Sequence, residues 1–173
     1  SLLVGAVVFG IWIAPDTLWP GWRSHWLFAN PLFSKAGASL ATGALQDPVS
    51  LALRSARAVV LVPIAEELFW RGWLMRWIEN SDFEKVPLGS WHARAFWITA
   101  ALFALEHGSY WEVGLAAGLA YNAWMVRTRN LTDLILAHAA TMPACAPGCS
   151  SRAVSSIGCS GSFQCAVYDL LKY

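Results

Sequence analysis

Charged residues are scarce in this chain of 173 residues: Asp, Glu, Lys and Arg make up 13% of it, and the formal net charge is +1. Soluble domains contain about 25% charged residues. The chain therefore has no basic surplus, and it has no basic stripe with interleaved aromatic residues, so we exclude nucleic acid as a partner. The remaining composition, 57% hydrophobic with 11 tryptophans, is typical of a membrane protein, because soluble domains are roughly 45 to 50% apolar.

Long uninterrupted apolar runs are also lacking. No run reaches the ~18 apolar residues of a simple transmembrane helix, because an ionisable residue cuts each run short. If helices carry such charges inside the membrane, Ala58 to Ile78 becomes one helix of about 31 Å, which is long enough to cross a bilayer core. We therefore expect an all-α, multi-span integral membrane bundle that interacts with the lipid bilayer.

Tryptophans gather near the start of the chain, at Trp12, Trp19, Trp22 and Trp26. Such a cluster is typical of an aromatic belt at a membrane surface. The alternative is a loop that packs on a soluble core.

The period of two that is typical of strands is absent, and the apolar segments predict helices instead. We expect helices over Leu2 to Ala14, Ala36 to Leu45, Ala58 to Ile78, Ala95 to His107, Trp111 to Val126, and Leu131 to about Met142. Asp47 followed by Pro48 predicts another helix start. Gly114 and Gly118 have the small-xxx-small spacing that suits close contact between helices.

Basic residues occur in two loops that flank one predicted helical hairpin: Lys85, Arg94, Arg127 and Arg129. Both loops should lie on the same side of the bundle. The positive-inside rule predicts that this side faces the cytoplasm, and we expect the protein in a bacterial inner membrane.

Cysteine is absent until position 145, and all four cysteines lie in the final segment, 142–173, which is rich in Ser, Gly and Pro. We expect the helical domain to comprise residues 1–141. The segment 142–173 is predicted to be an irregular tail that is not native to the fold, as a reading-frame shift would produce. Since the chain also begins without Met and directly in an apolar run, we expect it to be truncated at both ends.

Four charges lie within the apolar stretch VPIAEELFWRGWLMRW, Val62 to Trp77. On a helix, Glu67 and Arg71 share a face and can form an i, i+4 ion pair. Glu66 points about 100° away and is left unpaired. An ionisable group at membrane depth costs several kcal/mol unless it is paired or faces a wet cavity, so Glu66 is a candidate functional residue. The alternative is a solvated face of a surface helix.

Two histidines occupy other apolar helices. His107 follows Phe103 by one helical turn, and His138 lies in the last apolar helix. Each alone would be an ordinary core histidine, but together with Glu66 they predict a polar cavity inside the bundle.

This constellation supports two chemistries. In the first, Glu66 is the general base for a water molecule, His107 shares that water, and His138 donates to a developing oxyanion. In the second, Glu66, His107 and His138 hold Zn²⁺ with one open position.

The motifs Glu66-Glu67-xxx-Arg71, Phe103-xxx-His107 and His138-xxx-Met142 resemble the EExxxR, FxxxH and HxxxN signature of the type II CAAX prenyl protease and bacteriocin-processing family, known as CPBP or Abi. The similarity covers about residues 59–141. The Trp-rich flanks resemble the members that accompany exosortase systems.

The resemblance implies an intramembrane endopeptidase that cleaves a membrane-associated peptide or protein with glutamate-activated water and without an obligatory cofactor. It implies catalytic roles for Glu66, His107 and His138. Glu67, Arg71 and Phe103 would support them.

The departure from the signature is Met142, which stands where the family has Asn. Methionine offers no N–H donor, and loss of one oxyanion donor costs ~10² to 10³ in rate, so we expect impaired activity. Two alternatives stay open: a noncatalytic membrane scaffold or immunity-type protein that binds a peptide, and a zinc-dependent protease.

The cysteine spacings in the tail are x3, x9 and x5, which match no CxxC zinc pair. We therefore predict no disulfide or metal framework there. Thiol titration of the denatured protein without reductant should find four free thiols, and a smaller number would contradict this prediction.

Overall fold

The computed structural model describes residues 1–28 and 47–142. The predicted helix 36–45 and the cysteine-containing segment 143–173 lie outside the described residues. In the two described ranges every regular element is helical and none is a strand, which confirms the all-α prediction. The α-helices are α1 (Leu2–Leu18), α2 (Pro48–Ala56), α3 (Val62–Glu67), α4 (Met75–Glu79), α5 (Ala93–Glu106), α6 (Trp111–Thr128) and α7 (Leu131–Thr141).

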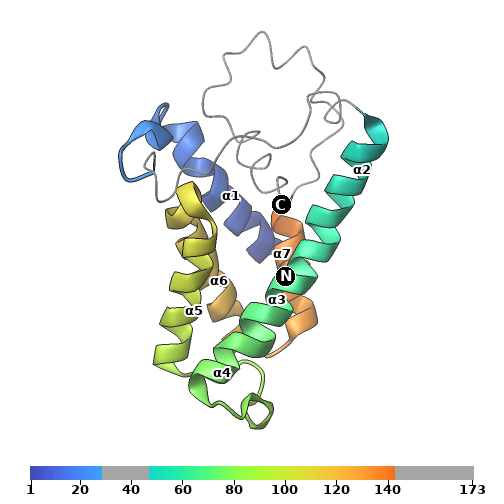
Figure 1. The fold of residues 1–173 in the computed structure, drawn as a ribbon, viewed down its shortest axis with the longest axis vertical. Helices are drawn as coiled ribbons and strands as arrows, with labels where there is room; N and C mark the ends of the chain where they lie inside the picture. The colour runs from blue at the N-terminus through green and yellow to red at the C-terminus, as the bar shows by residue number, and fades with distance from the viewer. Residues whose placement is uncertain (29–46, 143–173) are drawn as a thin grey trace.

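Helices α2, α3 and α4 form one continuous helical rod, which crosses Figure 1 as a long diagonal. It begins where predicted, because the Asp47 carboxylate accepts a hydrogen bond of 2.8 Å from the Ser50 N–H and caps the free amide end. Two π-helical stretches, Arg57–Leu61 and Leu68–Leu74, join the three segments. Short π-helical insertions are frequently found at functional sites, and here they flank the segment that carries Glu66 and Glu67.

Helices α5 and α6 form a hairpin whose contact depends on small residues. A Cβ added to Gly118 would lie 3.2 Å from the Phe103 ring and 3.3 Å from the Ala100 backbone, so a larger residue would force its neighbours on α5 to shift by a few tenths of an ångström. The close helix contact predicted from the glycine spacing is therefore confirmed. The loop between α4 and α5 reaches the far end of α6, where Gly89 lies against Arg129.

Helix α1 packs against α6 and α7. It continues to Leu18, four residues past the predicted end at Ala14. The prediction was wrong because Pro15 falls in the last turn, where the loss of one backbone N–H is tolerated and the Thr17 hydroxyl donates to the Ile13 and Ala14 carbonyls.

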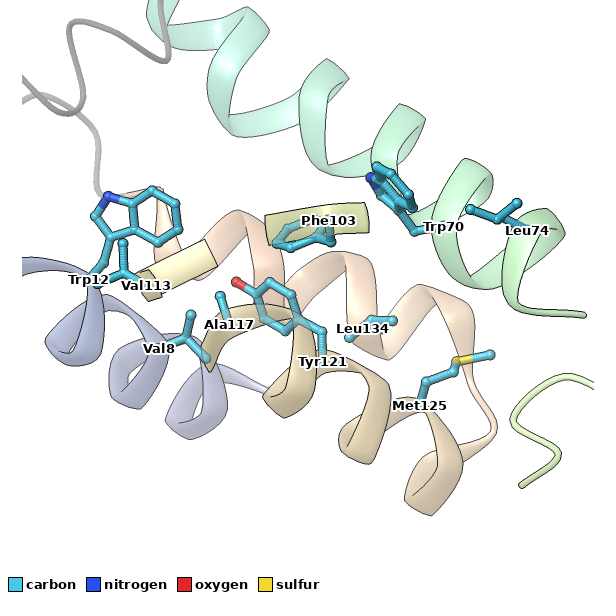
Figure 2. Packing of buried hydrophobic residues seen from close by; sticks show 10 residues of the cluster. All are labelled: Val8, Trp12, Trp70, Leu74, Phe103, Val113, Ala117, Tyr121, Met125 and Leu134. Carbon is cyan, nitrogen blue, oxygen red and sulfur yellow. The ribbon is translucent and has the colours of Figure 1, made fainter. Parts of the chain in front are cut away.

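The main core cluster gathers residues of α1, α5, α6, α7 and the second π-helical stretch. A smaller cluster, Met75, Ala95 and Phe96, lies between α4 and α5. Figure 2 shows Phe103 and Tyr121 in the middle of the main cluster, with Trp12 and Trp70 toward its two sides. Trp12 is thus a core residue and not a member of the surface belt, because its side chain points from α1 toward the hairpin of α5 and α6, where it contacts His107 and Tyr110. Trp26, by contrast, is 69% exposed.

The outer surface is unusually apolar. The exposed large hydrophobic side chains include Leu2, Leu3, Leu18, Trp19, Trp26, Leu53, Leu61, Trp77, Trp91, Trp97, Leu105 and Leu136. Across residues 1–28 and 47–142, no single helix combines the length and the apolarity that a membrane crossing requires.

Helix α1 approaches α7 closely at Gly5, where an added Cβ would lie 2.4 Å from the Ala137 carbonyl oxygen. We expect Gly5→Ala to lower the free energy of unfolding by about 1 to 3 kcal/mol through overpacking. Gly10→Ala is the matched control on the same helix, since it meets nothing within 4 Å. That control should raise stability by about 0.5 to 1 kcal/mol. Denaturant unfolding followed by circular dichroism measures both; equal effects would contradict the packing argument.

Candidate functional site

The ion pair predicted from the i, i+4 spacing is present and fully buried. Arg71 Nη1 lies 3.0 Å from each carboxylate oxygen of Glu67, and neither side chain is exposed. Burial of two charges costs several kcal/mol per ion and is offset only when further hydrogen bonds satisfy the remaining polar atoms. Arg71 obtains them from α6, where Nε donates to Asn122 Oδ1 at 2.8 Å and Nη2 donates to the Gly118 carbonyl at 3.2 Å.

His138 joins this pair from α7. Its Nδ1 lies 2.7 Å from Glu67 Oε1, so the structure pairs His138 with Glu67, the second glutamate of the motif. An ionised carboxylate only accepts hydrogen bonds, and therefore Nδ1 carries the proton. Nε2 can then donate to an oxyanion only when the ring carries a second proton.

Phe103 separates the two histidines. Its ring centroid lies 4.6 Å from that of His107 and 6.4 Å from that of His138, and the Arg71 guanidinium lies 4.7 Å above it. The Phe of the FxxxH motif thus fills the space between the charged groups and keeps bulk water out of it.

His107 caps the end of α5. Its Nδ1 lies 2.6 Å from the Phe103 carbonyl oxygen, which can only accept, so Nδ1 carries a proton. Gly114 gives the ring its room, because a Cβ there would lie 3.1 Å from the imidazole. The Trp12 ring meets the same imidazole edge-on at 5.2 Å.

Glu66 is half-buried, and its Oε2 is a buried atom without a hydrogen-bond partner among the described residues. The carboxylate interacts electrostatically with His138 and with Glu67, Arg71 and Glu106. The structure thus places Glu66 near His138. The prediction that Glu66 and His107 share one water molecule stays a prediction.

Three further polar or aromatic residues belong to the site and were not assigned from the sequence: Tyr121, Asn122 and Thr141. Tyr121 stacks on the His138 ring at 4.9 Å, and its hydroxyl is 2.6 Å from Thr141 Oγ1. The Thr141 proton goes to backbone carbonyls, so Tyr121 is the donor to Thr141. In the sequence, Tyr121 and Thr141 look like ordinary helix residues. Asn122 is a polar residue in an apolar helix, and this could have indicated a buried polar contact.

Nowhere in the described part of the chain do three His, Cys, Asp or Glu side chains gather closely enough to hold a metal ion. The zinc site proposed from Glu66, His107 and His138 therefore finds no support in this geometry.

Enzymes that activate water use glutamate and histidine side chains as general acids and bases. This bundle brings both residue types into its interior and leaves one carboxylate oxygen of Glu66 without a hydrogen-bond partner among the described residues. The chain belongs to the family described as Rce1-like, type II CAAX prenyl endopeptidase Rce1-like, which matches residues 48–142, more than half of its length. This is a family of membrane-embedded proteases, and the resemblance drawn from the three motifs is confirmed. No curated protein and no solved structure matches the chain. The narrower resemblance to exosortase-associated members stays a prediction.

The buried pair should dominate the stability of the bundle. Arg71→Met leaves the Glu67 carboxylate with His138 as its remaining partner, and we expect a loss of about 3 to 5 kcal/mol in the free energy of unfolding. Adding Glu67→Gln should recover part of that loss, because no buried charge is then unpaired. Lys85→Met breaks an exposed pair with Asp82 and should change stability little. Equal losses for Arg71→Met and Lys85→Met would show that burial is not the cause.

Proposed function

We propose that the chain is a glutamate-dependent intramembrane endopeptidase that cleaves a membrane-associated peptide or protein. The contrast between the two adjacent glutamates carries this proposal. Glu67 is fully paired with Arg71 and His138, whereas Glu66 retains a buried oxygen with no hydrogen-bond partner in the described ranges. A carboxylate oxygen of this kind is available to accept a proton from a water molecule.

In the proposed reaction, Glu66 removes a proton from water as the water oxygen attacks the scissile carbonyl carbon. His107 holds the same water through its Nε2 lone pair. His138, protonated and held by Glu67, donates from Nε2 to the oxyanion that forms. Glu66 then delivers the proton to the leaving nitrogen as the C–N bond breaks, so the base becomes the acid of the second step.

The surface supports a location in a lipid bilayer, which we propose to be the bacterial inner membrane. Trp19 and Trp26 are exposed near the end of α1, and Trp91 and Trp97 are exposed at the start of α5. Exposed tryptophans of this kind are enriched at membrane–water interfaces. The basic loops that carry Lys85 and Arg94, and Arg127 and Arg129, would face the cytoplasm.

Met142 bears on the rate of this reaction. It caps α7 one turn after His138 and has no hydrogen to donate to an oxyanion. Asn122 does not replace the family Asn, since its oxygen accepts from Arg71 and its amide donates to the Phe96 carbonyl. This is also the observation that favours the second candidate function, a noncatalytic membrane protein that binds a peptide at the same site.

The test uses the full chain in lipid vesicles, with an internally quenched, farnesylated peptide that ends in a CAAX sequence and its unprenylated counterpart. Met142→Asn should raise the cleavage rate by ~10² to 10³ through the added oxyanion donor. In that background Glu66→Gln should lower the rate by ~10² to 10⁴. Glu84→Gln, at an exposed carboxylate, is the matched control and should change nothing.

Two results would count against the proposal. Cleavage that survives Glu66→Gln would remove Glu66 from the role of base. Peptide binding by fluorescence anisotropy without cleavage by Met142→Asn would favour the binding protein.

A further inference from the structure

Asn122 occupies the centre of the hydrogen-bond network and is fully buried. Its amide orientation is fixed by two partners 2.8 Å away, because Arg71 Nε can only donate and the Phe96 carbonyl can only accept. The side chain therefore has two separable functions. One end holds Arg71, and the other end ties α6 to α5.

The hold on Arg71 comes from one face of α6. Gly118 and Asn122 are one helical turn apart and accept hydrogen bonds from Nη2 and Nε of the same guanidinium. The guanidinium carbon of Arg71 lies over two aromatic rings, 4.7 Å from the centroid of Phe103 and 5.5 Å from the centroid of Tyr121. A guanidinium is a rigid plane, so fixing Nε and Nη2 also fixes where Nη1 points.

Nη1 points at Glu67, and Glu67 points at His138. The successive distances are 2.8 Å from Asn122 to Arg71, 3.0 Å from Arg71 to Glu67, and 2.7 Å from Glu67 to His138. We infer that Asn122 is a positioning residue that sets the orientation and tautomer of His138 through Arg71 and Glu67. The inference rests on the proposed function for its catalytic consequence, since a misplacement of about 1 Å at a reacting group costs ~10²-fold in rate.

The test compares three substitutions. Asn122→Leu has similar volume and removes both hydrogen bonds. Asn122→Asp keeps an oxygen acceptor for Arg71 and loses the amide donor to Phe96. Thr99→Val is the matched control, because Thr99 is a fully buried polar residue of α5 whose hydroxyl has no partner among the described residues.

The first measurement needs no substrate. The full chain has four histidines, so the ring nitrogens of His138 can be followed by NMR in lipid nanodiscs and assigned by the loss of their signals in His138→Gln. With spectra recorded at a pH where the His138 ring is neutral, we expect the Nδ1–H tautomer in the unaltered chain, in Asn122→Asp and in Thr99→Val, and a mixture of tautomers in Asn122→Leu. If Asn122→Leu does not fold, Asn122→Ser takes its place, since the smaller side chain avoids a clash.

The second measurement is kinetic, in the Met142→Asn background with the farnesylated peptide. Asn122→Leu should lower kcat by roughly tenfold to a hundredfold with KM unchanged, and Asn122→Asp should recover most of that loss. In an Arg71→Lys background, which lacks the Nε donor, Asn122→Leu should have no further effect on kcat or on the tautomer.

The inference is overturned if Asn122→Leu leaves the His138 tautomer unchanged, or if Asn122→Asp and Asn122→Leu are equally impaired, since the tie to Phe96 would then be the whole role. It is also overturned if the effect of Asn122→Leu persists in Arg71→Lys. Absence of any cleavage together with the expected tautomers contradicts the proposed function alone, because the NMR result does not depend on substrate.

Discussion

The rest of the structure is arranged so that it offsets the desolvation free energy of burying Glu67 and Arg71. Two charges on one helix cannot leave water unless their remaining hydrogen-bonding capacity is met by other parts of the chain. Here α6 supplies two oxygens to Arg71, and α7 supplies an imidazole to Glu67. Gly118 lets α6 and α5 approach closely, because a Cβ at this position would lie only 3.3 Å from the Ala100 backbone. The polar groups therefore require the packing, and the packing in turn holds the polar groups in place.

Local features were predictable from the sequence, and tertiary ones were not. The helices predicted from apolar runs over Ala95 to His107, Trp111 to Val126 and Leu131 to about Met142 are observed at 93–106, 111–128 and 131–141. The Glu67–Arg71 pair follows from helical spacing alone. The pairing of His138 with Glu67 could not be predicted, because sequence spacing says nothing about which of two adjacent carboxylates faces another helix. Burial of Trp12 was missed for the same reason, since a tryptophan near a membrane surface and one in a core look alike in composition.

Helix α1 lies outside the residues that match the family, yet it completes the site. Trp12 covers the His107 ring, and the Gly5 carbonyl accepts from Thr141 at 3.2 Å. The matched segment 48–142 thus carries Glu66, His107 and His138, whereas an additional helix closes one side of the cluster and contacts the end of α7.

The Thr141 hydroxyl bonds to α1, to Tyr121 on α6 and to the preceding turn of α7. The last turn of α7 is consequently held from three directions immediately before position 142, whatever side chain stands there. Position 142 is therefore a place where the side chain can be exchanged while the last turn of α7, and with it His138, keeps its place in the bundle.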